Sequence, residues 1–140
     1  MIKVSVILTT YNSECYIQEV IHSIKQQKGQ GELYTMELIV VDDCSTDDTI
    51  RILQSENIPF ISTEINSGGP NKGRNVALER STGDFICIAD HDDIWFTDRI
   101  EKLLSATHLA PIVTSGYILS DLSSSKEIER VIQILGRRTK

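Results

Sequence analysis

Hydrophobic and polar positions alternate along the chain in two different periods. Residues 3–9 are β-branched or otherwise apolar with few interruptions, as in a strand that is covered on both faces. After the turn "TTYNS", apolar side chains recur at i, i+3, i+4 and i+7, at Ile17, Val20, Ile21 and Ile24. This spacing places them on one face of a helix, so the chain is predicted to begin with a buried strand followed by an amphipathic helix.

The same succession of strand and helix repeats along the chain. Three more apolar runs predict strands, namely "ELIVVDD", "PFISTE" and "DFICIAD". The segments after them predict helices: "STDDTIRIL" with Ser45 as its cap, "SGGPNKGRNVALERS", and "TDRIEKLL" with Thr97 or Asp98 as its cap. Such alternation predicts an α/β, Rossmann-like fold, a mostly parallel sheet with helices on both faces.

The segment beyond Pro111 is less regular. "PIVTSGYILSD" is compatible with a fifth strand, and Ile128, Val131, Ile132 and Leu135 have the spacing of a last amphipathic helix before a frayed "GRRTK" tail. We therefore expect one domain over residues 1–140, in which 106–140 add a strand and a C-terminal helix.

Length and charge restrict the classes of partner. The chain has 140 residues, 40% of them hydrophobic, which is enough for one core. Its net charge of -6 argues against a nucleic-acid surface and favours a metal-bridged polyphosphate as the partner of its acidic residues. No segment approaches the roughly 20 apolar residues of a membrane span, so we expect at most peripheral membrane contact, through the basic tail.

The three cysteines, Cys15, Cys44 and Cys87, have no metal-binding or redox spacing. They indicate reduced thiols, more often structural than reactive, in a cytoplasmic protein that works, if near a membrane, at its inner face.

Acidic residues follow the predicted strands. Asp90, Asp92 and Asp93 come directly after "DFICIA", where carboxylates need solvent, a partner or a cation. Mg2+ and Mn2+ prefer such oxygen ligands together with phosphate oxygens. The alternative is that these acids cap the turn before the next helix. Asp42 and Asp43 end the second strand, and the carboxyl ends of parallel strands share one edge, which favours a binding site there.

Other candidates are weaker. Asp47 and Asp48 fit the first turn of a helix and are interpreted as structural. The loop "NSGGPNKGRN" joins glycines to Lys72 and Arg74, which suits a phosphate cradle or a plain surface turn. Tyr11 would stack on a flat ligand, whereas Trp95 is expected to pack. The histidines show no metal spacing, and His91 is expected to be exposed.

Five blocks together resemble, in order and spacing, the nucleotide-binding half of family-two inverting glycosyltransferases with the GT-A fold. The resemblance spans residues 2 to about 105 and rests on "VSVILTTYN", "LIVVDDCSTDDT", "GGPNKGRNVAL", "GDFICIADHDDIW" and "DRIEKLL". It implies a nucleotide-sugar donor, most often a UDP-sugar. The implied nucleotide-binding residues are Thr9, Tyr11, Asp42 or Asp43, Lys72, Arg74, Asp90 and Asp92, and the implied ligands of Mg2+ or Mn2+ are Asp92 and Asp93.

The resemblance also implies a reaction. In this family the metal stabilises a departing diphosphate while an acceptor hydroxyl, activated by a carboxylate base, attacks from the opposite side. After Ser105 we find no acceptor-side block, and Asp121, Glu127 and Glu129 match no second acidic motif. We therefore expect a truncated enzyme that lacks its acceptor half and its catalytic base. The acceptor would be a saccharide or a lipid-linked molecule.

Two other classes remain open on the sequence. One is a nucleotide-binding or oligomerisation module without catalysis, in which an uncovered sheet edge pairs with a second copy. The other is a phosphoaspartate receiver domain, which is also α/β and binds Mg2+. A receiver would carry its acidic pair after the first strand, whereas here the pair follows the second.

Overall fold

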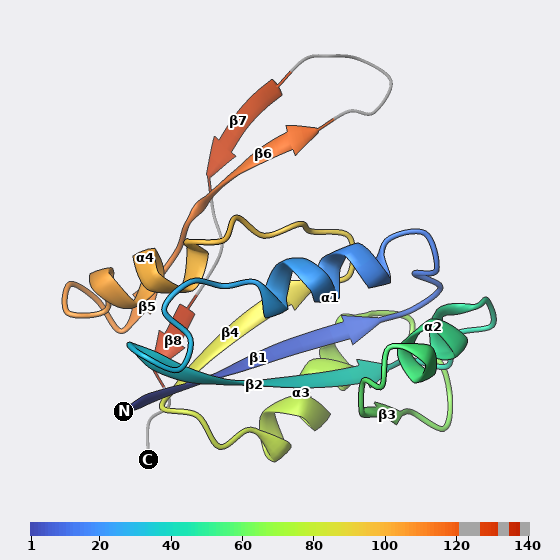
Figure 1. The fold of residues 1–140 in the computed structure, drawn as a ribbon. Coiled ribbons are helices and arrows are strands. Elements are labelled where there is room, and N and C mark those ends of the chain that lie inside the picture. The colour runs from blue at the N-terminus through green and yellow to red at the C-terminus, as the bar shows by residue number, and fades with distance from the viewer. Residues whose placement is uncertain (121–126, 132–134, 138–140) are drawn as a thin grey trace.

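The structure is a computed structural model that describes residues 1–120, 127–131 and 135–137. Its elements follow one another along the chain as shown in Figure 1. They are β1 (Ile2–Thr10), α1 (Ile17–Lys25), β2 (Tyr34–Asp42), α2 (Thr49–Ser55), β3 (Phe60–Ser62), α3 (Pro70–Arg80), β4 (Phe85–Asp90), α4 (Arg99–Ala106), β5 (Ile112–Val113), β6 (Gly116–Ser120), β7 (Glu127–Val131) and β8 (Leu135–Arg137).

The main sheet has the strand order β3-β2-β1-β4-β8-β5. Its first four strands are parallel, whereas β8 runs antiparallel to β4 and β5 antiparallel to β8. The predicted α/β fold with a mostly parallel sheet is therefore confirmed. β6 and β7 form a separate antiparallel pair that projects from the body of the molecule (Figure 1).

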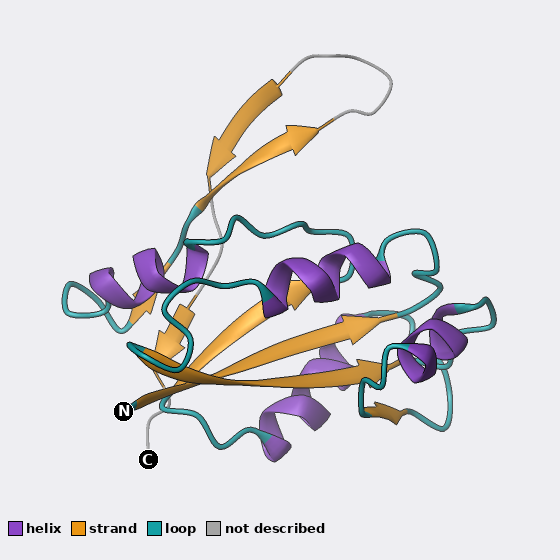
Figure 2. Cartoon of the chain, viewed as in Figure 1, coloured by secondary structure: helices purple, strands orange, loops and turns teal. Residues whose placement is uncertain are grey.

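Helices cover both faces of the sheet, as predicted (Figure 2). Alternate residues of β1 point to opposite faces: Val4, Val6 and Leu8 belong to the larger core, which α1, α2 and α4 complete. Ile7 belongs to a smaller cluster on the other face, beneath α3. The central strand is thus buried on both sides, which explains its nearly continuous apolar sequence.

Helix α3 packs closely on β1 because it presents Gly73 to the strand. A Cβ atom at Gly73 would lie 2.8 Å from Cγ2 of Thr9. Only the missing side chain allows this approach, which brings the start of α3 next to the ends of the strands.

The C-terminal part differs from the prediction. Instead of a helix through Ile128, Val131 and Leu135, the described residues form β7 and β8, and Ile132 lies outside the described residues. Ile128 pairs with Leu119 of β6, and Gly136, expected in a frayed tail, pairs with Ile86 of β4. A short run rich in β-branched residues is compatible with both a helix and a strand. Pairing with other segments of the chain decides which of the two forms.

Within the described part of the chain, no helix has the length and apolar character needed to cross a membrane.

Candidate functional site

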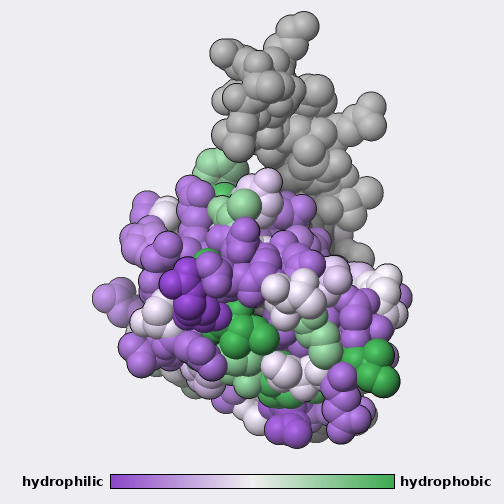
Figure 3. Space-filling model, turned by 90° about the vertical axis from the view of Figure 1, so that its right-hand side faces the viewer, coloured by the Kyte–Doolittle hydropathy of each residue, from purple (hydrophilic) through white to green (hydrophobic). Residues whose placement is uncertain are grey.

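The acidic strand ends meet at one edge of the sheet, as predicted. Thr10 pairs with Asp42 of β2, and Thr9 pairs with Asp90 of β4. Because neighbouring strands lie about 4.8 Å apart, the backbones of these two acids are about 10 Å apart on either side of β1. The surface at this edge is mainly hydrophilic with smaller apolar patches (Figure 3).

A cavity of about 350 Å³ opens at this edge. Of the residues predicted from the sequence, five line it: Thr9, Tyr11, Asp43, Asp90 and Asp92. Four others do not line it: Asp42, Lys72, Arg74 and Asp93. The wall also contains residues that the sequence did not single out as ligand contacts, namely Thr10, Asn66, Pro70 and His91.

Asp42 is fully buried and holds a turn. Its Oδ1 accepts hydrogen bonds from Oγ1 of Thr10 (3.2 Å) and Oγ of Ser45 (2.5 Å), and its Oδ2 accepts one from the Ser45 N–H (3.0 Å). The predicted helix cap at Ser45 is therefore wrong, because its hydroxyl is committed to Asp42. Helix α2 begins later, at Thr49.

Asp43 holds a different loop against the cavity. Its carboxylate accepts hydrogen bonds from Oγ1 of Thr63 and from both the N–H and Oγ of Ser67, each of 2.8 Å. Burial tends to raise the pKa of Asp43, but these hydrogen bonds and the charge of Lys72 prevail and lower it. Asp43 is thus a stable carboxylate in the cavity wall, and Lys72 acts on it through its charge.

The loops after β1 and β2 are joined by side chains that bind the opposite backbone. Oδ1 of Asn12 accepts the Thr46 N–H at 2.8 Å. The Glu14 N–H binds Asp47 at 3.0 Å, and the Asp48 N–H binds Glu14 at 2.9 Å. Asp47 and Asp48 are therefore structural, as predicted, although they precede α2 rather than lie within it.

The N-terminus of α3 forms another part of the wall. Gly68 has a φ of 76°, which favours glycine, and the N-cap Gly69 provides no side-chain cap. Pro70 occupies the first turn. The free N–H groups and the helix dipole make this end of α3 attractive to anions.

Arg74, on α3, reaches the site through Asp90. Its Nη2 lies 2.6 Å from Oδ1 of Asp90, and the two side chains are 30% and 41% exposed. The Nε of Arg74 is buried and has no hydrogen-bond partner in the part of the chain that the structure describes.

His91 contradicts its prediction. It is half-buried rather than exposed and lines the cavity between two acids. Its Nδ1 is buried without a hydrogen-bond partner among the described residues. A histidine between three aspartates looks solvated in the sequence, but the turn closed by the Asp93 N–H and the Asp90 carbonyl (3.2 Å) folds it inward.

The acids after β4 fit a cation only in part. Asp92 is exposed in the cavity wall, Asp93 lies half-buried beside it, and Asp90 already pairs with Arg74. Within the described ranges, no group of three His, Cys, Asp or Glu side chains is arranged to hold a metal. A hard cation that keeps waters and takes most ligands from phosphates would still fit one or two carboxylates here.

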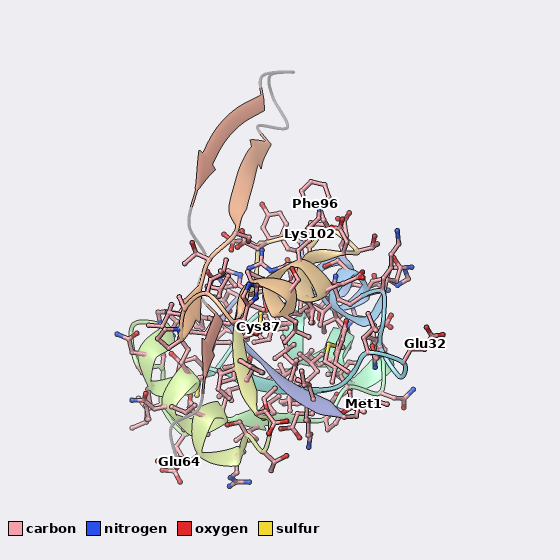
Figure 4. All side chains as sticks on the ribbon, turned by 90° about the vertical axis from the view of Figure 1, so that its left-hand side faces the viewer. Met1, Glu32, Glu64, Cys87, Phe96 and Lys102 are labelled. Carbon is pink, nitrogen blue, oxygen red and sulfur yellow. The ribbon has the colours of Figure 1, made fainter. Side chains whose placement is uncertain are left out.

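Trp95 is buried, and the three cysteines form no disulfide. Trp95 is 4% exposed and packs beneath the guanidinium of Arg99, 4.5 Å from its ring centre, which confirms a packing role. All three cysteines are free. Cys87 lies inside the molecule (Figure 4), and burial raises its pKa to about 11. Cys15, in contrast, is exposed.

Comparisons with known sequences find a matching family model and related proteins. The family model described as Glycosyl transferase family 2 matches residues 5–135. The chain is 45% identical over 97 residues to the poly(ribitol-phosphate) beta-N-acetylglucosaminyltransferase TarS of Staphylococcus aureus, which covers 66% of this chain and 17% of TarS. The match favours the glycosyltransferase interpretation over a phosphoaspartate receiver.

Solved structures resemble the chain as well. Residues 1–349 of S. aureus TarS in complex with UDP-GlcNAc align with a TM-score of 0.69 and 38% identity, over 79% of this chain and 33% of that one. The mannosyltransferase PcManGT from Pyrobaculum calidifontis, in complex with GDP-Man and Mn2+, aligns with a TM-score of 0.71 and 25% identity, over 80% and 34%. The chain thus spans about a third or less of these relatives.

Proposed function

Because the chain belongs to glycosyl transferase family 2, we propose that it forms the donor-binding part of an inverting glycosyltransferase, and that the donor is a UDP-sugar. The observation that carries this proposal is the cavity in which an exposed aromatic ring, three aspartates and a helix N-terminus meet. A nucleoside diphosphate needs a ring on which its base can stack, acceptors for the N–H groups of the base, and a positive site for its phosphates. These features must follow one another from the base to the phosphate end of the ligand.

The nucleoside end would lie between β1 and β2. Tyr11 is 43% exposed in the wall and offers a ring for stacking on the base. Asp43 is ionised and would accept the N–H of a uracil ring, with Thr9 beside it. Asp42, which is fully buried, supports this wall by holding the turn after β2.

The diphosphate would lie at the start of α3. The helix N-terminus, Lys72 and Arg74 supply positive potential there, and their sum favours two phosphates over a neutral ligand. The ribose and the sugar would lie toward Asp90 and Asp92, on the side of β4.

A divalent cation, Mn2+ or Mg2+, would be held by Asp92 and Asp93 together with diphosphate oxygens. The relative PcManGT was solved with Mn2+. Bound there, such an ion would stabilise the negative charge that the departing diphosphate develops. The acids themselves orient the donor and keep its sugar at the mouth of the cavity.

Transfer with inversion also needs a base near the acceptor hydroxyl. We assign no base among the described residues. For the acceptor we propose only a class, a saccharide or a lipid-linked molecule.

Calorimetric titration of the chain with UDP, with and without Mn2+, tests the proposal. We expect binding that Mn2+ strengthens, with GDP binding more weakly. Tyr11→Ala should weaken UDP about tenfold, because stacking of a base on an aromatic ring contributes about 1–3 kcal/mol. The matched control is Tyr16→Ala, which removes a tyrosine that is 47% exposed but outside the cavity wall. Absence of heat in every titration would refute the proposal.

The alternative function is a nucleotide-binding module without catalysis. It would use the same cavity but would assemble with a second copy of the chain. Strands β3 and β5 form the two edges of the main sheet, and an edge strand can pair with a second copy. A clean monomer in light scattering would contradict the expectation of a homo-oligomer.

A further inference from the structure

The loop between β4 and α4 carries the acids of the proposed donor site. Helix α1 and the residues just after it form hydrogen bonds with the second half of this loop. Two buried polar side chains do this: Ser23 on α1, which is 8% exposed, and Gln27 just after the helix, which is 5% exposed. They are one helical turn apart and contact the same stretch of the loop, about 70 residues away along the chain.

Gln27 uses both ends of its amide. Its Nε2 donates to the backbone carbonyl of Phe96 at 2.8 Å and to that of Ser23 at 3.1 Å. Its Oε1 accepts the N–H of Ile100, in the first turn of α4, at 3.1 Å. One side chain therefore caps the end of α1 and the start of α4 and holds the loop between β4 and α4.

Ser23 adds a second attachment. Its Oγ accepts the Trp95 N–H at 3.1 Å and donates to the carbonyl of Val20 at 2.7 Å. The backbone adds a third attachment, because the Lys28 N–H donates to the carbonyl of Thr97 at 2.8 Å. The ring of Phe96, by contrast, projects at the surface, 65% exposed (Figure 4), so its main chain rather than its side chain is held.

The chemistry of Gln27 is not replaceable by its nearest analogues. Leucine would leave the buried Ile100 N–H without its partner and would remove the Gln27 hydrogen bond from the Phe96 carbonyl, which would keep only the N–H of Arg99 at 3.1 Å. Glutamate would keep an acceptor for Ile100 but would turn a carboxylate oxygen toward two carbonyls. Only an amide donates and accepts in this arrangement.

We propose that Gln27 is a positioning residue of the donor site: by fixing the loop at residues 95–100, it sets where Asp92 stands relative to the N-terminus of α3. This inference rests on the proposed function. At its other end the loop is fixed by the turn between Asp90 and Asp93 (3.2 Å), and no helix or strand lies between the two attachments. Releasing the Gln27 attachment would loosen the segment that follows Asp93, and with it the position of the turn that carries Asp92, but would leave the wall around Tyr11 and Asp43 intact.

Trp95 reports directly on the attachment of this loop to Ser23 and Gln27, since it is the only tryptophan of the chain and is 4% exposed. In Gln27→Leu and Gln27→Glu we expect its emission to shift to the red and acrylamide quenching to increase. We expect the gain in UDP affinity from Mn2+ to fall about tenfold, the effect of a lost 1.4 kcal/mol, with the affinity for uridine unchanged. Loss of folded protein would also expose Trp95, but it would abolish the affinity for uridine as well, and this separates unfolding from a loosened loop.

The control is Gln26→Leu, which changes the preceding glutamine, an exposed one whose amide contacts His22. It should match the wild type in fluorescence and binding. Ser23→Ala, a smaller change, should raise quenching even if the Gln27 variants do not fold. The inference is overturned if wild type binds UDP and a Gln27 variant keeps both the full gain in UDP affinity from Mn2+ and a shielded Trp95. If the Gln27 variants do not fold, the same result in Ser23→Ala overturns it. Absence of UDP binding by wild type and Gln26→Leu alike would instead refute the proposed function.

Discussion

The guanidinium of Arg74 and the carboxylate of Asp90 form an ion pair, with Nη2 and Oδ1 2.6 Å apart. The pair joins α3, which covers one face of the sheet, to the end of β4. It thereby connects the two parts of the cavity that would hold the phosphates and the sugar.

Arg74→Met tests what this ion pair does. The pair is partly exposed, so its loss should cost at most about 1 kcal/mol of unfolding free energy in urea. UDP affinity should fall about tenfold, because a cation beside two phosphates is lost, whereas uridine should bind as before. Arg51→Met is the control, since Arg51 pairs with Asp48 on the surface of α2 at 2.6 Å. An unchanged affinity for UDP would show that Arg74 acts only within the protein.

The sequence was sufficient for the parallel sheet and for the edge at which its acids meet. Both follow from local periodicity, because a buried strand such as β1 and an amphipathic helix such as α1 show their environment in their own residues. Once the strands are parallel, the positions of Asp43 and Asp90 at one edge follow from topology alone.

What sequence reasoning could not supply depends on distant partners. Asp42 and Asp43 look equivalent in "VVDDCS", yet Ser45 binds the first while Thr63 and Ser67 bind the second. The strands β7 and β8 likewise depend on pairing with β6, β4 and β5. Gln27 was missed because no pattern near it signals that its amide serves a loop about 70 residues away.

Glu37 should make stability depend on acid pH. Burial tends to raise its pKa, but hydrogen bonds from Lys3, Ser5 and Thr82 prevail and lower it to about 2. The folded-state pKa lies below the ordinary value of 4.5, so this stability is complete above about pH 5 and is lost as the pH falls toward 2. With Lys3 37% exposed, we expect a contribution of about 2 kcal/mol.

Urea denaturation of Glu37→Gln between pH 2 and pH 7 measures this contribution. The variant should be less stable than wild type at pH 7 and should approach it as the pH falls to 2. Glu79→Gln, an exposed change on α3, should follow the wild-type curve. Parallel curves for Glu37→Gln and wild type would contradict the assignment.

Gly73→Ala should destabilise the fold even though alanine favours helices. The new Cβ would meet Cγ2 of Thr9 at 2.8 Å, and overpacking of this kind costs about 1–3 kcal/mol, against a helical gain of about 1 kcal/mol. We expect a net loss of about 1 kcal/mol in urea denaturation. Asn75→Ala, exposed on the same helix, should be neutral or slightly stabilising. An equal gain in both variants would show that α3 can move away from β1 freely.

Asp92 and Asp93 should differ in their effect on the metal. Asp92 lines the cavity and is exposed, whereas Asp93 is half-buried and lies outside the wall. Asp92→Asn should therefore remove most of the strengthening of UDP binding by Mn2+, and Asp93→Asn a smaller part, because a neutral amide is a weaker ligand of a hard cation than a carboxylate. Chelation of Mn2+ should bring wild type to the level of Asp92→Asn. A larger loss in Asp93→Asn would move the cation deeper, toward the loop that Gln27 holds, and would make Asp92 a ligand of the sugar instead.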